Sequence, residues 1–521
     1  MTKQDRPNFL FFITDQHRAD WLGCYGHPVV KTPNIDAIAA QGTRFDNFHV
    51  ATPVCMPNRA SLMTGRMPTV HGLRYNGCQL SRDANTFVDV LAAAGYDTAA
   101  IGKSHLQEFT TTPSWHDENI SDDGRLINEA WKNGYEKSQE NPDHYQSNKT
   151  HQIDTPYFGF QHVDMITRHG ATCGGHYEQW FRAQRSDWKE LRDRSNQFPH
   201  NYSCPQANRT KVPEDLYPTT WVADRAIDYL SNRSDDDAPF FTFVSFPDPH
   251  HPFNPPGKYW DMYSPDQFNV PLPYTAHKNP TPPMKWLENA RGSDQMTLQT
   301  AIYVEDQQIR EAMALTAGMI TMIDDHVGRV IEALKESGEY DNTVICFNSD
   351  HGDYLGDFNL LLKGLLPIRG VTRVPMIWSD PALRTGAVSD TLASTTDISA
   401  TILERAGIEP FYGMQGRSML PTIQSGEDHR DEVLIEFNDG APKFGFTEPA
   451  RVRALVNKDW RLTLYVGEDW GELYHLATDP GETHNLWDDP DHATTRAALT
   501  ERLAHHLAMQ MDESPRAHLV A

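Results

Sequence analysis

The sequence predicts an α/β fold, with a mostly parallel central sheet and helices on both of its faces. Apolar runs of strand length alternate with segments of helical periodicity along most of the chain. The runs are almost uninterrupted by polar residues, which is typical of strands buried on both faces. At 521 residues the chain is also long enough to bury a large core and to contain more than one domain.

The predicted elements follow this alternation. The candidate strands are residues 8–14, 98–102, 239–246, 343–348 and 374–378. Helices are expected before Gly42, over 86–95 and over 221–230. The clearest helix is predicted over 313–336, where apolar residues recur at helical spacing, namely Ile320, Ile323, Val327, Val330, Ile331 and Leu334.

Two segments depart from the pattern. Residues 110–215 are polar and lack clean periodicity, so we interpret them as an insertion that shapes a pocket or an interface. The aromatic and histidine side chains of this insertion include Tyr157, Phe158, His169 and His176. From about residue 425 short strands follow one another, as in 453–466 and 471–486, and a final helix is expected over 494–510. The prediction is a catalytic domain over 1–425 and a smaller α+β subdomain over 426–521, with a small antiparallel sheet.

Composition narrows the function. The formal net charge of -25 argues against nucleic acid or an anionic membrane as a partner. No stretch is long enough to span a bilayer, and the apolar run at 9–13 is too short for a signal core. The six cysteines show neither CxxC nor paired spacing. We therefore expect a cytoplasmic protein with reduced cysteines.

Reactive side chains follow four of the predicted strands. Strand by strand they are Asp15 and Gln16, Lys103 and His105, His250 and His251, and Asp350 and His351. If these strands are parallel, their tips meet at one edge of the sheet, where open α/β sheets bind ligands. Two neighbouring carboxylates would repel each other unless a cation lay between them, which favours a divalent metal. Lys103 and His105, two residues apart on an extended segment, would project to the same side.

The stretch CMPNR adds a nucleophile candidate. Pro57 suits the first position of a helix and Gly65 the position past its end, so Cys55 would lie at the helix N-terminus, which favours an anion or a thiolate. Arg59, one turn in, could hold a tetrahedral oxyanion with two N–H groups. A buried structural thiol is the alternative interpretation of Cys55. Lys363 follows the last strand tip and would add a further cation.

These motifs together resemble the type I sulfatases of the alkaline phosphatase superfamily. The resemblance covers nearly the whole chain, in segments that include TDQHRADWLGCYG, CMPNRASLMTGRMPTVHG, GYDTAAIGKSHL, SFPDPHHPF, NSDHGDYLGD and GELYHLATDPGETHNL. It implies an alkaline phosphatase-like fold and hydrolysis of a sulfate monoester, as in an arylsulfatase. It also implies that a formylglycine-generating enzyme oxidises Cys55 to Cα-formylglycine, whose hydrate is the nucleophile.

The resemblance assigns roles to the candidate residues. Asp15, Gln16, Asp350 and His351, with the modified Cys55, would bind one divalent metal ion, Mn or Ca. Arg59 and Lys103 would orient the hydrate, and His250 and Lys363 would bind the sulfate oxygens and assist the leaving group. His105 would be the base that resolves the sulfated intermediate, because a geminal diol can expel sulfate once its second proton is removed.

Several positions differ from the commonest sulfatase pattern. Asn58 stands where serine is usual, and Gln16 and His351 replace what are often Asp and Asn; an imidazole ligand favours manganese over calcium. Asp–Gln and Asp–His also occur in phosphonate monoester hydrolases of this superfamily, and Asn76 falls where those enzymes carry a substrate-facing asparagine. Those enzymes tend to have Tyr and Thr at 103 and 105, so a sulfatase with phosphonate or phosphodiester side activity is favoured.

Two alternatives stay open at this point, a phosphonate monoester or phosphodiester hydrolase and a non-catalytic anion-binding protein with an unmodified Cys55. The expected substrate is a small sulfate ester whose alcohol the sequence does not select. We also expect a homo-oligomer, with the insertion and the C-terminal tail as contact surfaces.

Overall fold

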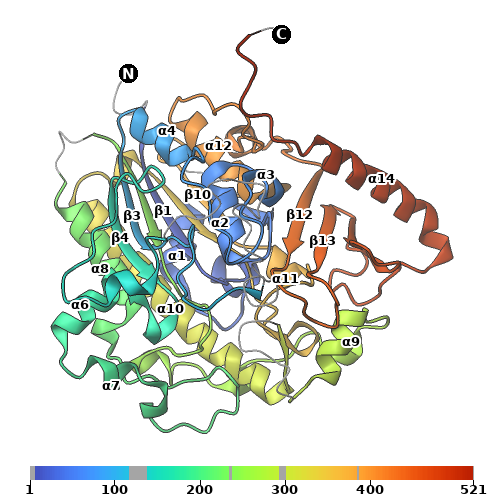
Figure 1. Cartoon of the computed structure of the whole chain (residues 1–521), viewed down its shortest axis with the longest axis horizontal. Helices are drawn as coiled ribbons and strands as arrows, with labels where there is room; N and C mark the ends of the chain where they lie inside the picture. The colour runs from blue at the N-terminus through green and yellow to red at the C-terminus, as the bar shows by residue number, and fades with distance from the viewer. Residues whose placement is uncertain (1–5, 116–137, 234–237, 293–300, 384–385, 520–521) are drawn as a thin grey trace, which may run out of the picture.

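The computed structural model describes residues 6–115, 138–233, 238–292, 301–383 and 386–519. Within these ranges the central element is a nine-stranded mixed sheet (Figure 1) with the order β11-β2-β10-β8-β1-β6-β3-β4-β5. In chain order its strands are β1 (Asn8–Thr14), β2 (Thr43–His49), β3 (Asp97–Lys103), β4 (His162–Thr167), β5 (Gly174–Gly175), β6 (Phe240–Ser245), β8 (Thr343–Ser349), β10 (Met376–Ser379) and β11 (Ala387–Ser394).

The four strands that precede the predicted site residues are neighbours and run parallel, as expected. β1 pairs with β8 on one side and with β6 on the other, and β6 pairs with β3. β10 differs, because it runs antiparallel between β8 and β2. An apolar run has the same pattern in either chain direction, so the sequence predicts this strand without predicting its orientation.

Helices cover both faces of the sheet, as predicted, and β1 shows how the two faces divide. Leu10 and Phe12 belong to one core with α1, α6, α8 and α10, whereas Phe9, Phe11 and Ile13 belong to a second core with α2, α4 and α12. These helices are α1 (Pro33–Ala40), α2 (Cys55–Thr64), α4 (Phe87–Ala93), α6 (His176–Gln184), α8 (Pro218–Ser231), α10 (Asp306–Glu336) and α12 (Thr395–Arg405).

The longest helix, α10, begins seven residues before the predicted start at 313. Glu305 and Gln308 form a capping box that satisfies the first free backbone N–H groups of the helix. Shorter helices complete the fold, namely α3 (Pro68–His71), α7 (Trp188–Arg192), α9 (Pro282–Asn289), α11 (Arg369–Thr372) and α13 (Leu420–Ser425). A two-stranded sheet pairs β7 (Ile302–Tyr303) with β9 (Leu360–Leu361).

The predicted insertion over 110–215 contributes to the sheet as well as departing from it. β4 pairs parallel with β3, β5 forms the edge of the sheet, and α6 packs into the core. Only the second half of β4 is buried, which is why its sequence HVDMIT lacks the continuous apolar run of a central strand. Residues 116–137 of the insertion lie outside the described residues.

The C-terminal subdomain is a four-stranded antiparallel sheet covered by one helix (Figure 1, right). Its elements are β12 (Glu432–Asn438), β13 (Arg451–Asn457), β14 (Trp460–Tyr465), β15 (Gly471–His475) and α14 (Ala493–Met509). Leu499 and Leu503 of α14 pack on one face of the sheet, and Val452 from the other face shares a core with Leu365 and Leu366. The subdomain therefore supports the segment that carries Lys363; the boundary near residue 425 stays a prediction.

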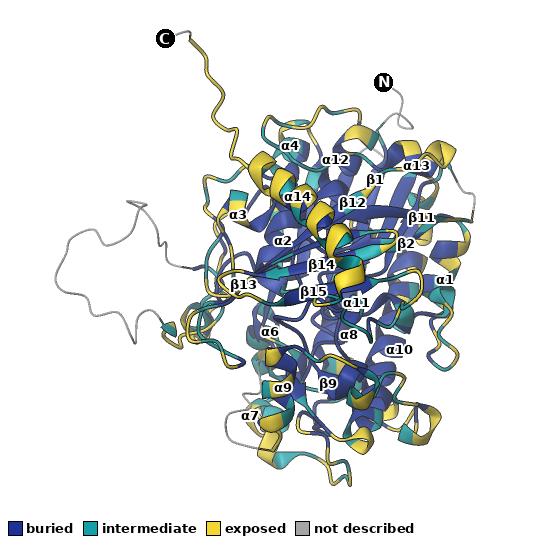
Figure 2. Ribbon diagram, turned by 90° about the vertical axis from the view of Figure 1, so that its right-hand side faces the viewer, coloured by how far each residue is buried: buried dark blue, intermediate teal, exposed yellow. Residues whose placement is uncertain are grey.

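Burial follows the layers of the fold (Figure 2). The central strands and α10 are dark blue, whereas the outer face of α14 is yellow. Although α10 is long, it carries charged residues along its sequence. No helix in the described ranges combines the length and the apolar character needed to cross a membrane.

Candidate active site

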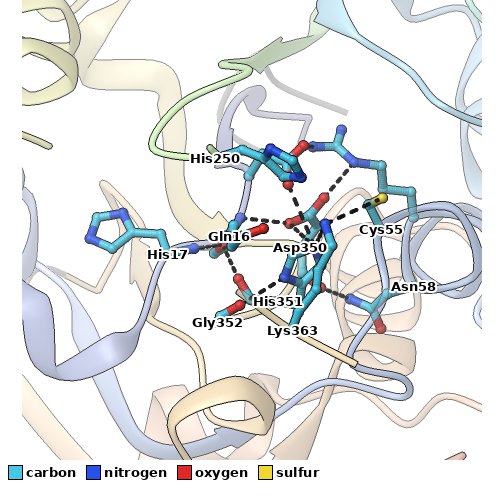
Figure 3. A network of polar contacts seen from close by, with 12 residues as sticks. Gln16, His17, Cys55, Asn58, His250, Asp350, His351, Gly352 and Lys363 are labelled. Atoms are coloured by element: carbon cyan, nitrogen blue, oxygen red, sulfur yellow. Dashed lines mark hydrogen bonds and ion pairs between the residues drawn. The ribbon is translucent and has the colours of Figure 1, made fainter. Parts of the chain in front are cut away.

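The carboxyl ends of β1, β3, β6 and β8 meet at one edge of the sheet and bring the predicted residues together (Figure 3). Asp15 follows β1 directly and Asp350 follows β8, and both side chains are completely buried. The Asp350 N–H donates to Thr14 O at 3.1 Å, and the Asp15 N–H donates to Asp248 O at 3.1 Å. Backbone hydrogen bonds between neighbouring strands therefore fix the main-chain positions of Asp15 and Asp350, from which both carboxylates project.

Asp15, Asp350 and His351 form a buried cluster whose ligand atoms all lie within 4.8 Å of one another. His351 Nε2 lies 3.5 Å from Asp15 Oδ1 and 3.6 Å from Asp350 Oδ1. On the same ring, Nδ1 faces the Gly352 carbonyl at 2.8 Å, so Nδ1 carries the proton and Nε2 offers a lone pair. Two carboxylates and one imidazole in this volume suit a divalent cation.

Two orphaned oxygen atoms support the same conclusion. Asp15 Oδ1 and Gln16 Oε1 are buried without a hydrogen-bond partner, an unfavourable situation that a cation between them would relieve. Gln16 is held in the left-handed region, with φ 67°, and its N–H donates to Asp350 Oδ1 at 3.1 Å. Its Nε2 donates to Asp353 Oδ2 at 2.5 Å, which leaves Oε1 as the free end of the amide. The residues present therefore fit a divalent metal ion.

Cys55 lies beside this cluster as the first residue of α2, with 1% of its surface exposed. Its Sγ lies 3.4 Å from Asn76 Nδ2 and 3.8 Å from Lys363 Nζ, while Lys363 Nζ is also 3.0 Å from a nitrogen of His351. Burial raises the pKa of the thiol, but the charges of Lys363 and nearby Lys103, together with a hydrogen bond from His105, outweigh it and hold this pKa well below its ordinary value. The position therefore favours a negatively charged group.

The helix that carries Cys55 differs slightly from the prediction. It begins at Cys55, so Pro57 is its third residue instead of its first. Pro57 still lies in the first turn, where the backbone N–H groups have no partner within the helix. Gly65 ends the helix in the left-handed conformation, as predicted. Asn58 ties the helix to the sheet, because its Nδ2 donates to the Asp350 carbonyl at 2.6 Å. No local pattern in the sequence indicates this contact.

Arg59 lies one turn into α2 and is buried, and most of its guanidinium is already hydrogen-bonded. Its Nε donates to Asp350 Oδ2 at 2.8 Å, and its Nη1 donates to Lys103 O at 2.8 Å and to Ser245 Oγ at 2.9 Å. Within this guanidinium only Nη2 lacks a hydrogen-bond partner, and it lies 3.9 Å from Asp15 Oδ2. The two N–H groups predicted for an oxyanion could therefore come only from Nη2, and their role in binding one stays a prediction.

Lys103 and His105 both reach the site, but not along an extended segment. Lys103 ends β3 and forms an ion pair with Asp15. His105 has a φ of 59°, because the buried Glu140 carboxylate accepts its N–H at 3.0 Å and the next N–H, of Leu106, at 3.1 Å. Burial lowers the pKa of the His105 imidazole to about 4, so the ring is neutral near pH 7 and able to accept a proton.

His250 belongs to a stack of imidazole rings beside Lys103. Its ring lies 3.5 Å from that of His169 and 3.9 Å from that of His251, measured between centroids. His169 Nε2 is 2.6 Å from Lys103 Nζ. Burial lowers the pKa of His250 well below its ordinary value, and the neighbouring His169 and His251 lower it further. His250 therefore favours its neutral form in this structure.

Of the four rings singled out in the insertion, the structure brings His169 to the site. Tyr157 and Phe158 are buried in a core, where the Tyr157 hydroxyl donates to Glu140 at 2.8 Å, and His176 accepts the Met165 N–H at 3.1 Å. His169 follows β4, so the strand-tip rule would have found it if residues 162–167 had been recognised as a strand. Glu140 has no such signal, because its role depends on folding of the insertion.

Comparisons with known proteins agree with this geometry. The sequence model of the Sulfatase family matches residues 7–408, and one described as N-sulphoglucosamine sulphohydrolase, C-terminal, matches residues 368–509. An arylsulfatase of Clostridium perfringens is 31% identical over 446 residues, which cover 84% of this chain and 82% of that protein. The multifunctional alkaline phosphatase superfamily protein PehA of Trinickia caryophylli is 29% identical over 462 residues, with 83% and 80% covered. The structure of a phosphonate monoester hydrolase of Agrobacterium radiobacter shares the fold, with a TM-score of 0.76, 24% identity, and 98% and 97% of the two chains covered.

The fold and the clustered strand-tip residues define a hydrolase of the alkaline phosphatase superfamily. The chain belongs to the sulfatase family, as the match over 7–408 shows. The resemblance predicted from the sequence and the predicted fold class are both confirmed. The family generally uses a formylglycine and a divalent metal ion, and the buried cluster around Asp15 is a candidate site for that ion.

Proposed function

We propose that this chain hydrolyses a sulfate monoester, in the manner of an arylsulfatase, with Cys55 converted to Cα-formylglycine. The observation that carries the proposal is the position of Cys55, at the N-terminus of α2, between Asn76 and Lys363 and beside the cluster of Asp15 and Asp350. A nucleophile at this point would have both a cation site and ammonium groups close by, as transfer of an anionic group requires.

Asp15, Gln16, Asp350 and His351 would bind the metal ion, and the modified Cys55 would add a further ligand. When bound, a divalent ion supplies Lewis acidity, which lowers the pKa of a hydroxyl group and offsets negative charge on the substrate. Mn²⁺ and Ca²⁺ are the two candidates, and the imidazole of His351 favours Mn²⁺, since calcium sites are built from oxygen ligands.

The remaining side chains have roles that their positions support. Arg59, through its free Nη2, and Lys103 would orient the formylglycine hydrate. His250 and Lys363 would bind the sulfate oxygens and assist departure of the alcohol. The hydrate has one hydroxyl to attack sulfur and a second from which neutral His105 would take a proton, so that sulfate leaves by cleavage of a C–O bond.

The test compares substrates on one preparation of known metal content. We expect kcat/KM for an aryl sulfate to exceed that for a phosphonate monoester of the same aryl alcohol. The reverse order, at equal metal occupancy, would contradict the sulfatase assignment and favour the second candidate.

That second candidate is a phosphonate monoester or phosphodiester hydrolase. Gln16, His351 and Asn76 support it, since they match the pattern of those enzymes, and PehA is a relative named as multifunctional. Lys103 and His105 favour the sulfatase, because both lie at the site and those enzymes tend to carry other residues there. We therefore propose phosphonate and phosphodiester hydrolysis as side activities.

Modification of Cys55 has its own test. Mass spectrometry of the tryptic peptide 45–59, from protein produced in its native host, should show an aldehyde in place of the thiol. An unmodified cysteine would exclude the mechanism and support an anion-binding protein instead. A formylglycine-generating enzyme as maturation partner, a small sulfate ester as substrate, a homo-oligomeric state and a cytoplasmic location remain our predictions.

A further inference from the structure

His169 occupies a position that the proposed mechanism does not use. It follows β4 within the insertion, and its side chain is 18% exposed, whereas those of Asp15 and Lys103 are completely buried. Its ring lies flat against that of His250, with centroids 3.5 Å apart and an angle of 8° between the planes. Phe109 also contacts it, nearly perpendicular to it, with centroids 5.7 Å apart and an angle of 75° between the planes. The ring thus packs against two aromatic neighbours at the partly exposed wall of the site.

The edge of the same ring contacts the ion pair of Lys103 and Asp15. Lys103 Nζ lies 2.6 Å from His169 Nε2, and Asp15 Oδ2 lies 3.5 Å from that nitrogen. An ammonium group has only donors, so Nε2 must accept this hydrogen bond, and the ring proton must be on Nδ1. His169 therefore has two separable contacts, an acceptor for Lys103 and a flat surface for His250.

We propose that His169 is a positioning residue that fixes the Lys103 ammonium through Nε2 and the His250 ring through stacking. The proposal rests on the sulfate-ester hydrolysis proposed above, in which Lys103 orients the nucleophile and His250 binds the sulfate. Without the acceptor, Lys103 would turn more freely about its long side chain. Without the stack, His250 would lose the ring that lies closest to its own.

A second metal ion is the competing explanation for this cluster. Ligand atoms of Asp15, His169 and His250 lie within 4.8 Å of one another, as a metal site would require. At this cluster, however, Lys103 Nζ already pairs with both Asp15 and His169. The first cluster instead keeps Asp15 Oδ1 and Gln16 Oε1 without a hydrogen-bond partner, as a cation site requires. We therefore assign the His169 nitrogen to the ammonium group and expect one metal ion per chain.

Three substitutions at this position separate the two contacts. His169→Phe keeps a flat ring against His250 and removes the acceptor. His169→Gln keeps an acceptor oxygen for Lys103 and removes the ring. His169→Ala removes both, and His144→Ala is the matched control, because His144 stacks on His151 in the same insertion, 4.8 Å between centroids, and contacts none of the proposed site residues.

Two measurements are made on each metal-loaded variant, kcat for an aryl sulfate and the Kd of inorganic sulfate by calorimetry. We expect His169→Phe to lower kcat about tenfold and to leave the sulfate Kd within twofold, since loss of such a supporting contact typically costs about 10- to 100-fold. We expect His169→Gln to raise the sulfate Kd about tenfold and to keep kcat within threefold. His169→Ala should show both changes, and His144→Ala neither.

Equal loss of kcat and sulfate affinity in the Phe and Gln variants would overturn the proposal, because a merely structural role would not separate them. Variants that match the wild type would overturn it too, as would two metal ions per wild-type chain by elemental analysis. If His169→Ala does not fold, the Phe and Gln variants decide. A wild type that binds sulfate but turns over no sulfate ester would refute the proposed function instead, and the sulfate Kd series would still test the stacking contact.

Discussion

Gln16 Nε2 donates to Asp353 Oδ2 at 2.5 Å, and this hydrogen bond determines which end of the Gln16 amide is free for a cation. Asp353 is itself fixed, since its Oδ1 accepts the N–H groups of Leu355 and Leu362 at 2.7 and 2.8 Å. Replacement of a group that orients a metal ligand typically costs about 10- to 100-fold in metal affinity. The relationship therefore predicts a role for Asp353 in metal binding, although it lies outside the ligand cluster.

Asp353→Asn should weaken Mn²⁺ binding about 10- to 100-fold, because an amide has one acceptor oxygen where the carboxylate has two. The Kd is measured by titration of metal-free protein. Asp357→Asn is the matched control, a buried aspartate of the same segment that pairs with Arg18 and does not contact Gln16. Equal Mn²⁺ affinity in the Asp353 variant and the wild type would contradict the assignment.

Cys55→Ala should lower kcat/KM for the sulfate ester by about 10⁴-fold or more, as loss of a nucleophile does. The fold should survive, since the side chain is small and the helix keeps Gly65 at its end and the Asn58 contact to the sheet. Activity assays and thermal unfolding on the same sample check both parts. Residual activity within tenfold of the wild type would exclude Cys55 as the nucleophile.

His105→Ala should trap the sulfated intermediate, because no other base would remove the second proton of the hydrate. In the wild type, burial keeps the pKa of His105 at about 4, so the neutral ring is available at neutral pH. A quenched reaction with excess ester is digested, and the mass of peptide 45–59 is measured. Turnover at the wild-type rate would remove the assigned role.

Lys363→Ala should raise KM and lower kcat together, so that kcat/KM falls by about 10²- to 10³-fold. The reason is that the Lys363 ammonium lies 3.8 Å from Cys55 Sγ and would contact both the substrate and the transition state. Steady-state kinetics at saturating metal measures both constants. Lys443→Ala is a control from the same chain, because Lys443 is partly exposed and pairs with Asp439 instead of a proposed site residue. A change confined to KM would assign Lys363 to binding alone.

Glu140 predicts a pH dependence of stability. Burial raises the pKa of its carboxyl from an ordinary value of 4.5 to about 7. Between these values the native state binds more protons than the unfolded state, so the free energy of unfolding falls as pH rises, by roughly 3 kcal/mol in all. Glu140→Gln should remove this contribution, so its stability relative to the wild type should improve from pH 5 to pH 8. Denaturant unfolding at the two pH values measures this, and a constant difference would contradict it.

The sequence by itself determined the α/β class and most of the metal cluster. β1 and β8 are largely apolar in sequence, and Asp15 and Asp350 follow them directly. The strands and the residues after them can both be read from the sequence, and together they predict that the two carboxylates lie close to each other. Cys55 before a helix that ends at Gly65 follows from turn and cap preferences in the same way. In each case the information is local, and a general rule of parallel sheets supplies the distant contact.

Only the tertiary structure decided the rest. β10 runs antiparallel, and most of the N–H groups of Arg59 are bonded to residues at the strand ends. His105 has a left-handed backbone conformation, in which its N–H donates to Glu140. The tertiary structure also brought His169 against Lys103 and His250. These contacts join segments far apart in the chain, and their geometry depends on how the insertion packs against the sheet. Hydrophobic periodicity records which face of an element is buried, but it does not record which buried polar groups will meet.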